Sequence, residues 1–359
     1  MTSVGIPTET KPSERRVALT TAGVHELVAH DVEVRVQAGA GFGAGIDDAD
    51  YAAAGATIVA DAADAWAADI VCKVKEPQAA EFGYLRDDLT LFTFLHLAAY
   101  PAVAEALVSA GTTAIAYETV ERSGRLPLLA PMSEVAGRIS VQAGATHLED
   151  SRGGRGVLLG GVPGVTPAHV VVVGAGHVGW NAARMAAGMG ARVTILDLSV
   201  DRLRELDELL FGRMTTITSS REAVGDAVAE ADLVIGAVLV PGAKAPHVIT
   251  EEHIRSMQRG AVVVDVAIDQ GGCVETSRET SHREPTFVLH DVVHYAVGNM
   301  PGAVPRTSTF ALTNATTPYL VDLAAHGLDV AVRRRPELGG GINIRDGSVT
   351  HPVVAGALA

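Results

Sequence analysis

Cysteine is nearly absent from this sequence: Cys72 and Cys273 are the only two among its 359 residues. Two cysteines so far apart supply neither a disulfide framework nor the closely spaced ligands of a zinc site. We therefore expect no metal centre. The scarcity of cysteine also fits a protein of the reducing cytoplasm, which is the expected location.

Positive charge is in deficit as well. The chain has 28 lysines and arginines against 42 aspartates and glutamates, which gives a formal net charge of −14. Proteins that bind nucleic acids need a basic stripe that displaces counterions from the phosphates, so this balance argues against that class. An anionic small molecule would need a local cationic pocket that acts against the overall field.

The sequence also lacks a long, uninterrupted apolar run. Residues 1–16 carry charges where a signal peptide would need an apolar core. The most apolar stretch, 89–110, is interrupted by His96, Pro101 and Glu105. That pattern favours a buried strand followed by a helix over a membrane span. The sequence therefore predicts a soluble intracellular protein with no membrane association.

What the chain does have is a regular alternation of apolar runs and helical patterns, in a length that suits two domains of about 150 to 200 residues. From about 170 to 300, short runs of Val, Ile and Leu alternate with helices. Runs this apolar are typical of parallel strands buried on both faces of a sheet. The expected strands of this part are 170–176, 191–197, 232–238 and 261–267.

The N-terminal third shows a weaker form of the same alternation, so the sequence predicts two α/β domains with parallel sheets. Its expected strands include DIVCKVK and TLFTFLH. Residues 127–148 are predicted to form a long helix that starts after Pro131, with Ser133 as its N-cap. This helix would connect the two domains.

A glycine motif follows the strand predicted at 170–176. Gly174, Gly176 and Gly179 have the spacing G-x-G-x-x-G between a strand and a helix, where backbone amides can bind a pyrophosphate. Asp197 ends the next predicted strand, 23 residues after Gly174, where a carboxylate would bind ribose hydroxyls and repel a 2′-phosphate. NAD is therefore favoured over NADP. The alternatives are a plain turn with Asp197 as a helix cap, and the glycine-rich loop of a methyltransferase.

Polar residues also stand where predicted strands end. Lys75 and His96 close DIVCKVK and TLFTFLH, Asp269 follows 261–267, and Arg16 lies in the loop after the first strand. Ligands of open α/β sheets bind beyond the carboxyl ends of the strands. These four residue types suggest oxidoreduction at a carbon that bears oxygen or nitrogen and lies next to a carboxylate.

Each of the four has a chemical role in this interpretation. Arg16 would hold the carboxylate through a two-point fork, and Lys75 would polarise a carbonyl. His96 suits proton exchange at the substrate heteroatom, and Asp269 would accept a proton from an amine or from attacking ammonia. Two structural alternatives stay open: Arg16 as a loop charge paired with Glu14, and His96 as an ordinary core residue.

Periodicity leaves two further choices open. Lys73 shares a strand face with Lys75, so the alternation of side chains does not decide which one reaches a ligand. Asp265 and Asp269 both lie near the same predicted strand end, and either one can be structural.

Several longer stretches resemble the bacterial alanine dehydrogenase family, in order and over almost the whole chain. The resemblance implies reversible, NAD-linked oxidative deamination of L-alanine to pyruvate and ammonia, so the expected partners are L-alanine, pyruvate and ammonium. The matching stretches include VGIPTETKPSERRVALTTAGV, VCKVKEP, LFTFLHLAA, PLLAPMSEVAGR, GGVPGV, LVIGAVLVPGAKAP, VVDVAIDQGGC and VPRTSTFALTNATTPY.

The resemblance also implies an architecture. It consists of two doubly wound parallel-sheet domains, in which a Rossmann NAD-binding domain (128–305) is inserted into a substrate-binding domain (1–127 and 306–359). A helix over 307–327 would return the chain to the first domain. Members of the family are usually homohexamers, so a homo-oligomer is expected. The tail from about 335 looks short and divergent.

By position, the family's substrate and proton-transfer residues fall on Arg16, Lys75, His96 and Asp269. PSERR stands where the family has an asparagine-rich turn before the arginine. The family's cofactor contacts fall on the glycine loop and on residues near later strand ends. These are Ser133, Gly176, Val178, Asp197, Arg202, Ser219, Val238, Leu239, Asn299 and Met300. Gly174 and Gly179 are expected at the cofactor from the glycine motif itself.

Three alternative functions remain at this point. A related dehydrogenase can act on another small 2-oxo acid or on a non-protein amino acid, because pocket size is not visible in a sequence. A transhydrogenase nucleotide-binding subunit shares the architecture but has no need of the carboxylate-binding residues. An NAD-binding sensor without turnover would not require the four polar residues together.

Overall fold

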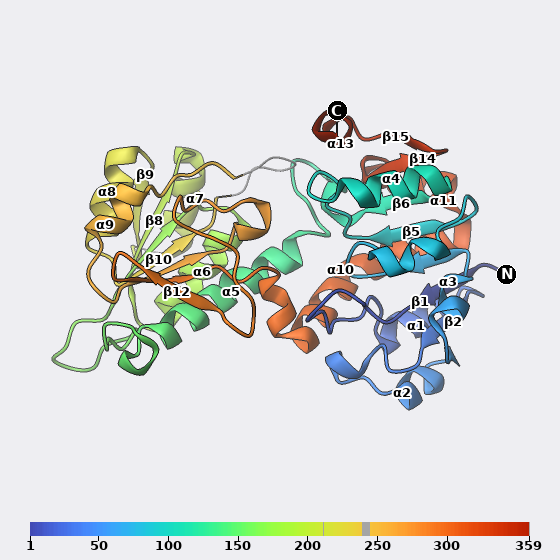
Figure 1. The fold of residues 1–359 in the computed structure, drawn as a ribbon, viewed down its shortest axis with the longest axis horizontal. Helices are drawn as coiled ribbons and strands as arrows, with labels where there is room; N and C mark the ends of the chain where they lie inside the picture. Colours follow the sequence, from blue (N-terminus) through green and yellow to red (C-terminus); the bar gives the residue numbers. More distant parts are fainter. Residues whose placement is uncertain (211, 239–244, 359) are drawn as a thin grey trace. The chain divides into compact units, whose positions relative to one another are not determined.

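The chain folds into two compact units, each built around a sheet of its own (Figure 1). The first unit comprises Met1–Met132 and Val304–Ala359, and the second comprises Ser133–Ala303. The structure is a computed structural model, and it describes residues 1–210, 212–238 and 245–358. Among these residues no helix is long and apolar enough to cross a membrane.

The sheet of the second unit has seven strands within the described residues, in the order β12-β13-β11-β10-β7-β8-β9. Neighbouring strands are parallel except β12 and β13, which are antiparallel. The parallel strands follow the doubly wound order 3-2-1-4-5-6. Their bounds are β7 (His169–Val173), β8 (Arg192–Asp197), β9 (Thr215–Thr218), β10 (Leu233–Gly236), β11 (Val262–Asp265), β12 (Thr286–Leu289) and β13 (Val292–Tyr295).

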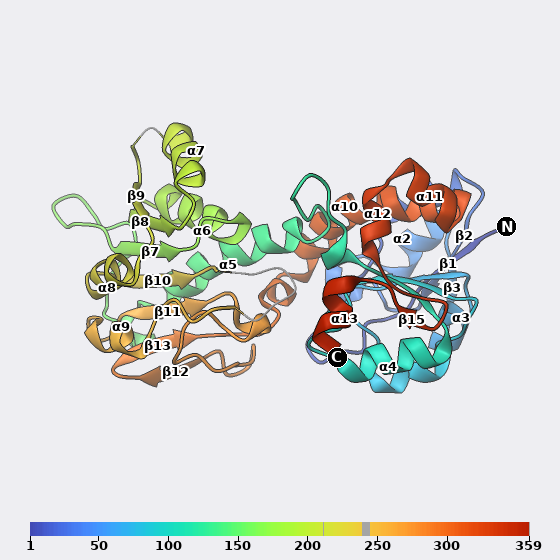
Figure 2. The same ribbon diagram turned by 90° about the horizontal axis from the view of Figure 1, so that it is seen from above.

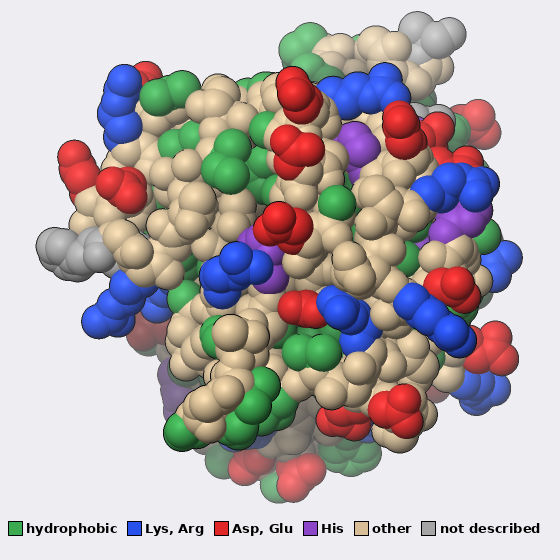
Figure 3. Space-filling view, turned by 90° about the vertical axis from the view of Figure 1, so that its left-hand side faces the viewer, with side chains coloured by type: hydrophobic (Ala, Val, Ile, Leu, Met, Phe, Trp, Pro, Cys, Tyr) green, Lys and Arg blue, Asp and Glu red, His purple; other side chains and the backbone are tan. Residues whose placement is uncertain are grey.

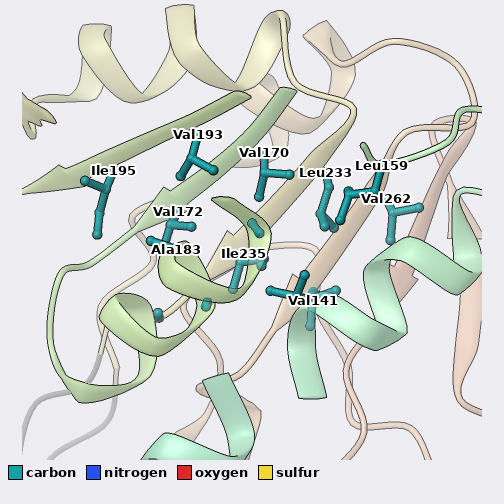
Figure 4. Close-up of a cluster of buried hydrophobic side chains, with 14 of the residues drawn as sticks. Val141, Leu159, Val170, Val172, Ala183, Val193, Ile195, Leu233, Ile235 and Val262 are labelled. Carbon is teal, nitrogen blue, oxygen red and sulfur yellow. The ribbon is translucent and has the colours of Figure 1, made fainter. Parts of the chain in front are cut away.

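Both faces of this sheet are buried. Val170 and Val172 of β7 lie in a core with Val141 and Ala183, which come from helices α5 and α6 (Figure 4). Val171 lies in a separate core on the other face, with residues of α8 and α9. Two buried faces require apolar side chains at successive positions, which explains the uninterrupted valine runs. The helices are α5 (Ala130–His147), α6 (His177–Gly188), α7 (Val200–Leu210), α8 (Arg221–Ala229) and α9 (Glu251–Ser256).

The sheet of the first unit has eight strands in the described residues, in the order β15-β14-β6-β5-β4-β1-β2-β3. Its parallel strands repeat the order 3-2-1-4-5-6, while β14 pairs antiparallel with both β6 and β15. Their bounds are β1 (Ser3–Ile6), β2 (Glu33–Gln37), β3 (Thr57–Val59), β4 (Ile70–Cys72), β5 (Thr90–Thr93), β6 (Thr113–Ala116), β14 (Ile342–Arg345) and β15 (Ser348–Val349).

Helices cover both faces of this sheet too. Trp66 of α3, Leu107 of α4 and Val354 of α13 share one core with the strands. Helices α10, α11 and α12 lie on the opposite side of the sheet (Figure 2). The helices of the unit are α1 (Thr21–Val28), α2 (Asp48–Ala53), α3 (Ala62–Trp66), α4 (Pro101–Ala110), α10 (Pro305–His326), α11 (Leu328–Arg334), α12 (Glu337–Gly341) and α13 (Pro352–Leu358).

The predicted class of two doubly wound α/β sheets is confirmed, and the structure adds antiparallel strands at one edge of each sheet. In the first unit these strands come from the tail that looked divergent. Asp346 and Gly347 form the turn between β14 and β15, both at positive φ (52° and 68°). An Asp-Gly pair is a strong hairpin signal, so the sequence did carry a mark of this hairpin.

Two predicted strands end earlier than expected. β4 ends at Cys72 and β5 ends at Thr93, so Lys75 and His96 lie in the loops that follow these strands. β4 ends early because Val74 donates its backbone N–H to the Glu9 carboxylate (2.6 Å) and not to a neighbouring strand. His96 has a φ of 47°, which is incompatible with a strand.

The prediction for the helix at 127–148 is wrong about its start. Helix α5 begins at Ala130, so Ser133 lies inside the first turn and is not the N-cap. Pro131 also lies in this first turn, where its missing N–H costs no helical hydrogen bond. A proline in this position marks the start of the helix and does not precede it.

Candidate active site

The glycine loop lies between β7 and α6. Gly174 has a φ of 101°, and a Cβ on Gly179 would lie 1.8 Å from the Gly174 carbonyl oxygen, so helix and loop require glycine at both positions. Gly176 immediately precedes α6, and a Cβ there would meet no described atom within 4 Å. The loop therefore leaves open space beside a helix N-terminus, which fits the pyrophosphate of a dinucleotide.

Asp197, at the end of β8, faces this loop. Its Oδ2 accepts a hydrogen bond from the Ala175 amide (2.6 Å), and its Oδ1 accepts one from the Ser199 amide (2.8 Å). Arg202 donates from Nε to the Ala175 carbonyl oxygen (2.9 Å). Asp197 thus fixes the turn into α7, as the alternative of a plain turn with a helix cap predicts. It also lies beside the glycine loop. A carboxylate oxygen can accept a second hydrogen bond, so these contacts are compatible with ribose binding.

Most of the remaining residues expected to contact the cofactor follow the carboxyl ends of the parallel strands. The carboxyl ends of parallel strands share one edge of a sheet, so these residues follow the same edge as the glycine loop. Leu239 lies outside the described residues. The others are Ser219 after β9, Val238 after β10, Asn299 and Met300 after β13, Val178 in the first turn of α6, and Ser133 in the first turn of α5.

The two aspartates near the end of β11 have different surroundings. Asp265 is buried and accepts the backbone amides of Cys273 (3.2 Å) and Val274 (3.0 Å), so it organises the loop. Asp269 is exposed and accepts the backbone amide of Asn299 (2.9 Å). Of the two, Asp269 is the carboxylate that solvent and ligands can reach.

In the first unit, Arg16, Lys75 and His96 follow β1, β4 and β5. The strand order reverses between β1 and β4, and ligands of doubly wound sheets bind at such a point. The loop after β1 spans residues 7–20, whereas only residues 174–176 separate β7 from α6 in the second unit. This longer loop carries Arg16 back over the strand ends.

Arg16 is 2% exposed and has a defined orientation. Its Nε and Nη2 donate to the two carboxylate oxygens of Glu14 (2.7 and 2.5 Å), and its Nη1 lies 3.0 Å from the Met132 sulfur. The neighbouring Arg15 is exposed. Glu14 is thus an ion-pair partner of Arg16, as the alternative of a paired loop charge predicts. Burial and a fixed guanidinium plane distinguish this arginine from an ordinary loop charge.

Lys73 and Lys75 are distinguished by their partners. Lys73 is 0% exposed, and its Nζ lies 2.9 Å from Glu81 Oε1 and 3.3 Å from Glu9 Oε2. It is therefore part of a buried ion cluster. The charge of Lys75 lowers the pKa of the His96 imidazole, which indicates that the two side chains are close to each other. Lys75 is thus the lysine of the pair that accompanies the other site residues.

His96 has a left-handed backbone, with φ at 47°. The carboxylate of Glu118 accepts the backbone amides of His96 (2.6 Å) and Leu95 (3.2 Å). The imidazole stacks on the ring of Phe94, with 5.6 Å between centroids and 2° between planes. Burial raises the pKa of Glu118, and the amides of His96 and Leu95 oppose that rise. Backbone and ring of His96 are both held in place.

The electrostatic environment keeps His96 neutral. Burial lowers the pKa of His96 well below its ordinary value of 6.5, and the charges of Lys75, Lys11 and Arg16 lower it further. A neutral imidazole has one N–H donor and one acceptor nitrogen. The same result shows that three cations act on one imidazole, so the structure brings Arg16 and Lys75 into the neighbourhood of His96. Arg16 and Lys11 are themselves paired with the carboxylates of Glu14 (2.5 Å) and Glu76 (2.6 Å), so the site holds charges of both signs.

Two carboxylates of this site, Glu9 and Glu118, were not found from the sequence, and Glu14 was expected only in the structural alternative for Arg16. The rule that ligands bind at strand ends would have found Glu118, because it lies two residues after β6. Glu9 and Glu14 lie in the loop after β1, where no periodic pattern singles them out.

On the face drawn in Figure 3, Lys and Arg side chains are interspersed with Asp and Glu and form no continuous basic stripe. The fold and the glycine loop instead define the class of two-unit α/β proteins with a doubly wound dinucleotide-binding sheet.

Comparisons with known proteins specify that class. The model of the alanine dehydrogenase/PNT N-terminal domain matches residues 5–136, and the model of the C-terminal domain matches residues 140–352. The chain belongs to the alanine dehydrogenase/PNT family. Membership implies an oxidoreductase with a nicotinamide cofactor, and the second unit supplies a loop that fits one.

Individual relatives agree. The chain is 58% identical to the alanine dehydrogenase of Mycobacterium tuberculosis over 354 residues, which cover 98% of this chain and 95% of that protein. A solved L-alanine dehydrogenase matches with a TM-score of 0.95 and 50% identity, over 99% of this chain and all of that one (100%). A transhydrogenase from Sinorhizobium meliloti matches less closely, with a TM-score of 0.82 and 26% identity, over 98% and 99% of the two chains.

Proposed function

We propose that this chain catalyses the NAD-dependent, reversible oxidative deamination of L-alanine to pyruvate and ammonia. The observation that carries the proposal is the gathering of Arg16, Lys75 and His96 at one edge of the first sheet. The second support is that the chain is 58% identical to the alanine dehydrogenase of Mycobacterium tuberculosis. A protein that only binds a dinucleotide would have no need of these three residues together in its other unit.

The first unit holds the substrate in this proposal. Arg16, oriented by Glu14, binds the carboxylate that alanine and pyruvate share. Lys75 places its ammonium group at the carbonyl oxygen of pyruvate and polarises it. Lys75 offsets the negative charge of the substrate, which the chain as a whole would repel, while Arg16, already paired with Glu14, supplies directed N–H donors.

His96 exchanges protons with the substrate oxygen. Since its imidazole is neutral, it can donate a proton from one nitrogen and accept one at the other, as a reversible reaction requires. Asp269 accepts a proton from the substrate nitrogen in this scheme. Replacement of Asp269 by Asn should therefore slow both amination and deamination, and full activity in both directions would remove Asp269 from the mechanism.

The second unit holds the cofactor. A nicotinamide held there would supply hydride transfer to and from the substrate α-carbon. The residues that would contact the cofactor are those around the glycine loop. Asp197 favours NAD, because a carboxylate that faces this loop repels a 2′-phosphate. Replacement of Asp197 by Ser should raise kcat/KM for NADPH relative to NADH, and an unchanged ratio would assign Asp197 to loop structure alone.

The experiment that tests the proposed function follows NADH oxidation with purified protein, ammonium and a panel of 2-oxo acids. We expect turnover with pyruvate and much slower turnover with glyoxylate and 2-oxobutyrate. Faster turnover with another 2-oxo acid would assign the chain to a related dehydrogenase. Binding of NADH without turnover of any acid would identify a sensor.

We also propose that the chain works as a homohexamer in the cytoplasm, as its family resemblance implies. Sedimentation velocity of the purified protein measures the assembly directly. A monomeric protein with full activity would contradict the oligomeric part of this proposal.

A further inference from the structure

A buried cluster of three charged side chains lies against the loop of the first unit that carries Lys75. Lys73 is 0% exposed, and the side chains of Glu9 and Glu81 are 3% and 4% exposed. The lysine ammonium lies 2.9 Å from Glu81 Oε1 and 3.3 Å from Glu9 Oε2, and it also faces the ring of Trp66 at 5.8 Å. The cluster thus holds one positive and two negative groups.

The two carboxylates bind the backbone of the loop that carries Lys75. Glu9 accepts the amide of Val74 through Oε1 (2.6 Å) and the amide of Lys75 through Oε2 (3.3 Å). Glu81 accepts the amide of Gln78 through Oε2 (2.8 Å). Both ends of the segment from Val74 to Gln78 are therefore fixed by carboxylates that share one ammonium.

Such a cluster is a poor way to gain stability. Removing charges from water costs several kcal/mol for each ion, and well-packed apolar groups are often as stable or more stable in such a place. This cluster also carries one negative charge more than it can pair. Burial raises the pKa of Glu9, and the largest effect that opposes this rise is the charge of Lys73. Lys73 thus helps to keep Glu9 in the form that accepts two amides.

We propose that Glu9 is a positioning residue for the reaction, with Lys73 as its ion-pair partner, and that it acts by fixing the backbone of Lys75. Neither Glu9 nor Lys73 touches the substrate in this scheme. The inference rests on the proposed function, in which Lys75 polarises the substrate carbonyl. A positioning role for Glu9 explains why an ion cluster with unequal charges is buried next to the backbone of Lys75.

The test uses the variant Glu9→Gln in the full-length protein. Glutamine has the same shape, but it has one oxygen acceptor where the carboxylate has two, so one of the two backbone amides loses its partner and Tm should fall in either case. A purely structural role predicts unchanged kinetics at a temperature where the variant is folded. A positioning role predicts a loss of about 10- to 100-fold in kcat/KM for pyruvate in the folded variant, since small displacements of a reacting group cost this much. KM for NADH should change by less than about twofold, because the cofactor residues lie in the other unit.

Asp322→Asn is the matched control. Asp322 is a buried carboxylate of the same unit that pairs with Arg334 and Arg335, and it contacts none of the site residues through these pairs. We expect its kinetics for pyruvate to equal those of the wild type. Equal losses in both variants would assign the effect to general destabilisation and overturn the proposal.

A double-mutant cycle tests whether Glu9 acts through Lys75. The dissociation constant of pyruvate is measured by the fluorescence of bound NADH, without ammonium, for wild type, Glu9→Gln, Lys75→Met and the double variant. We expect Glu9→Gln to weaken binding in the wild type but by less than about twofold in Lys75→Met. An equal loss in both backgrounds would overturn the proposal. Failure of the proposed function is a different result, because the wild type itself would then turn over neither alanine nor pyruvate.

Discussion

The left-handed backbone of His96 depends on the carboxylate of Glu118, so the replacement Glu118→Gln should slow catalysis without unfolding the protein. Glu118 accepts the amides of His96 (2.6 Å) and Leu95 (3.2 Å). Glutamine keeps one carbonyl oxygen at this place but loses the charge. The ring of His96 should then leave its stacked position on Phe94 for part of the time.

The size of the effect follows from these two hydrogen bonds. Bonds to a charged acceptor contribute about 1.5–3 kcal/mol, and neutral bonds contribute about 0.5–1.5 kcal/mol. The left-handed conformation of a residue other than glycine costs about 1–2 kcal/mol, which the carboxylate offsets. A net loss of about 1.4 kcal/mol would lower the population of the productive His96 conformation about tenfold. We therefore expect kcat/KM for pyruvate to fall by about this factor.

The assay is steady-state NADH oxidation with pyruvate and saturating ammonium, together with thermal unfolding. Glu337→Gln is the control. In the described residues the Glu337 carboxylate accepts a hydrogen bond from the neutral hydroxyl of Tyr319 (3.0 Å) and not from the backbone of a site residue. This variant should keep wild-type kinetics. If Glu118→Gln retains full kcat/KM, the carboxylate does not hold His96. If KM for NADH rises in parallel, the effect is not specific to the substrate site.

Three further changes have defined outcomes. Arg16→Lys should raise KM for pyruvate about 10- to 100-fold, because an ammonium group loses the two-point fork, and unchanged KM would exclude Arg16 as the carboxylate anchor. Gly179→Ala should destabilise the protein by about 1–3 kcal/mol, because its Cβ would lie 1.8 Å from the Gly174 oxygen. Gly176→Ala should keep the same Tm but weaken NADH binding in a fluorescence titration, and equal Tm losses for both variants would refute this reading of the loop. Since the folded-state pKa of His96 is lowered, its neutral form should persist as pH falls through 6.5, so kcat/KM for pyruvate at fixed free ammonia should decline only below that value.

The parallel sheets could be predicted because burial on two faces leaves a direct record in the sequence. Val170 to Val173 are apolar at each position, since the two cores of the second unit take alternate residues of β7. The hairpin of β14 and β15 was not predicted, because its strands are short and mixed in polarity. Its Asp-Gly turn was the only local mark.

The places of the candidate site residues relative to the strands were predictable, whereas contacts that depend on a long-range partner were not. Lys73 and Lys75 have the same periodicity, and only the distances from Lys73 to Glu9 and Glu81 show that it belongs to a buried cluster. His96 was expected at the end of a strand. Its left-handed backbone depends on Glu118, which is 22 residues away, so no local pattern could show it.

In the proposed function, the repeated strand order places two kinds of anion site at the same topological position. In the second unit the loop after the first strand is three residues long, 174–176, and it offers backbone amides to an anion. In the first unit the corresponding loop spans 7–20, and it offers the guanidinium of Arg16. Point mutations change side chains but leave amides in place. Selection can therefore alter which acid the protein accepts through single substitutions in the long loop, while the cofactor site stays the same.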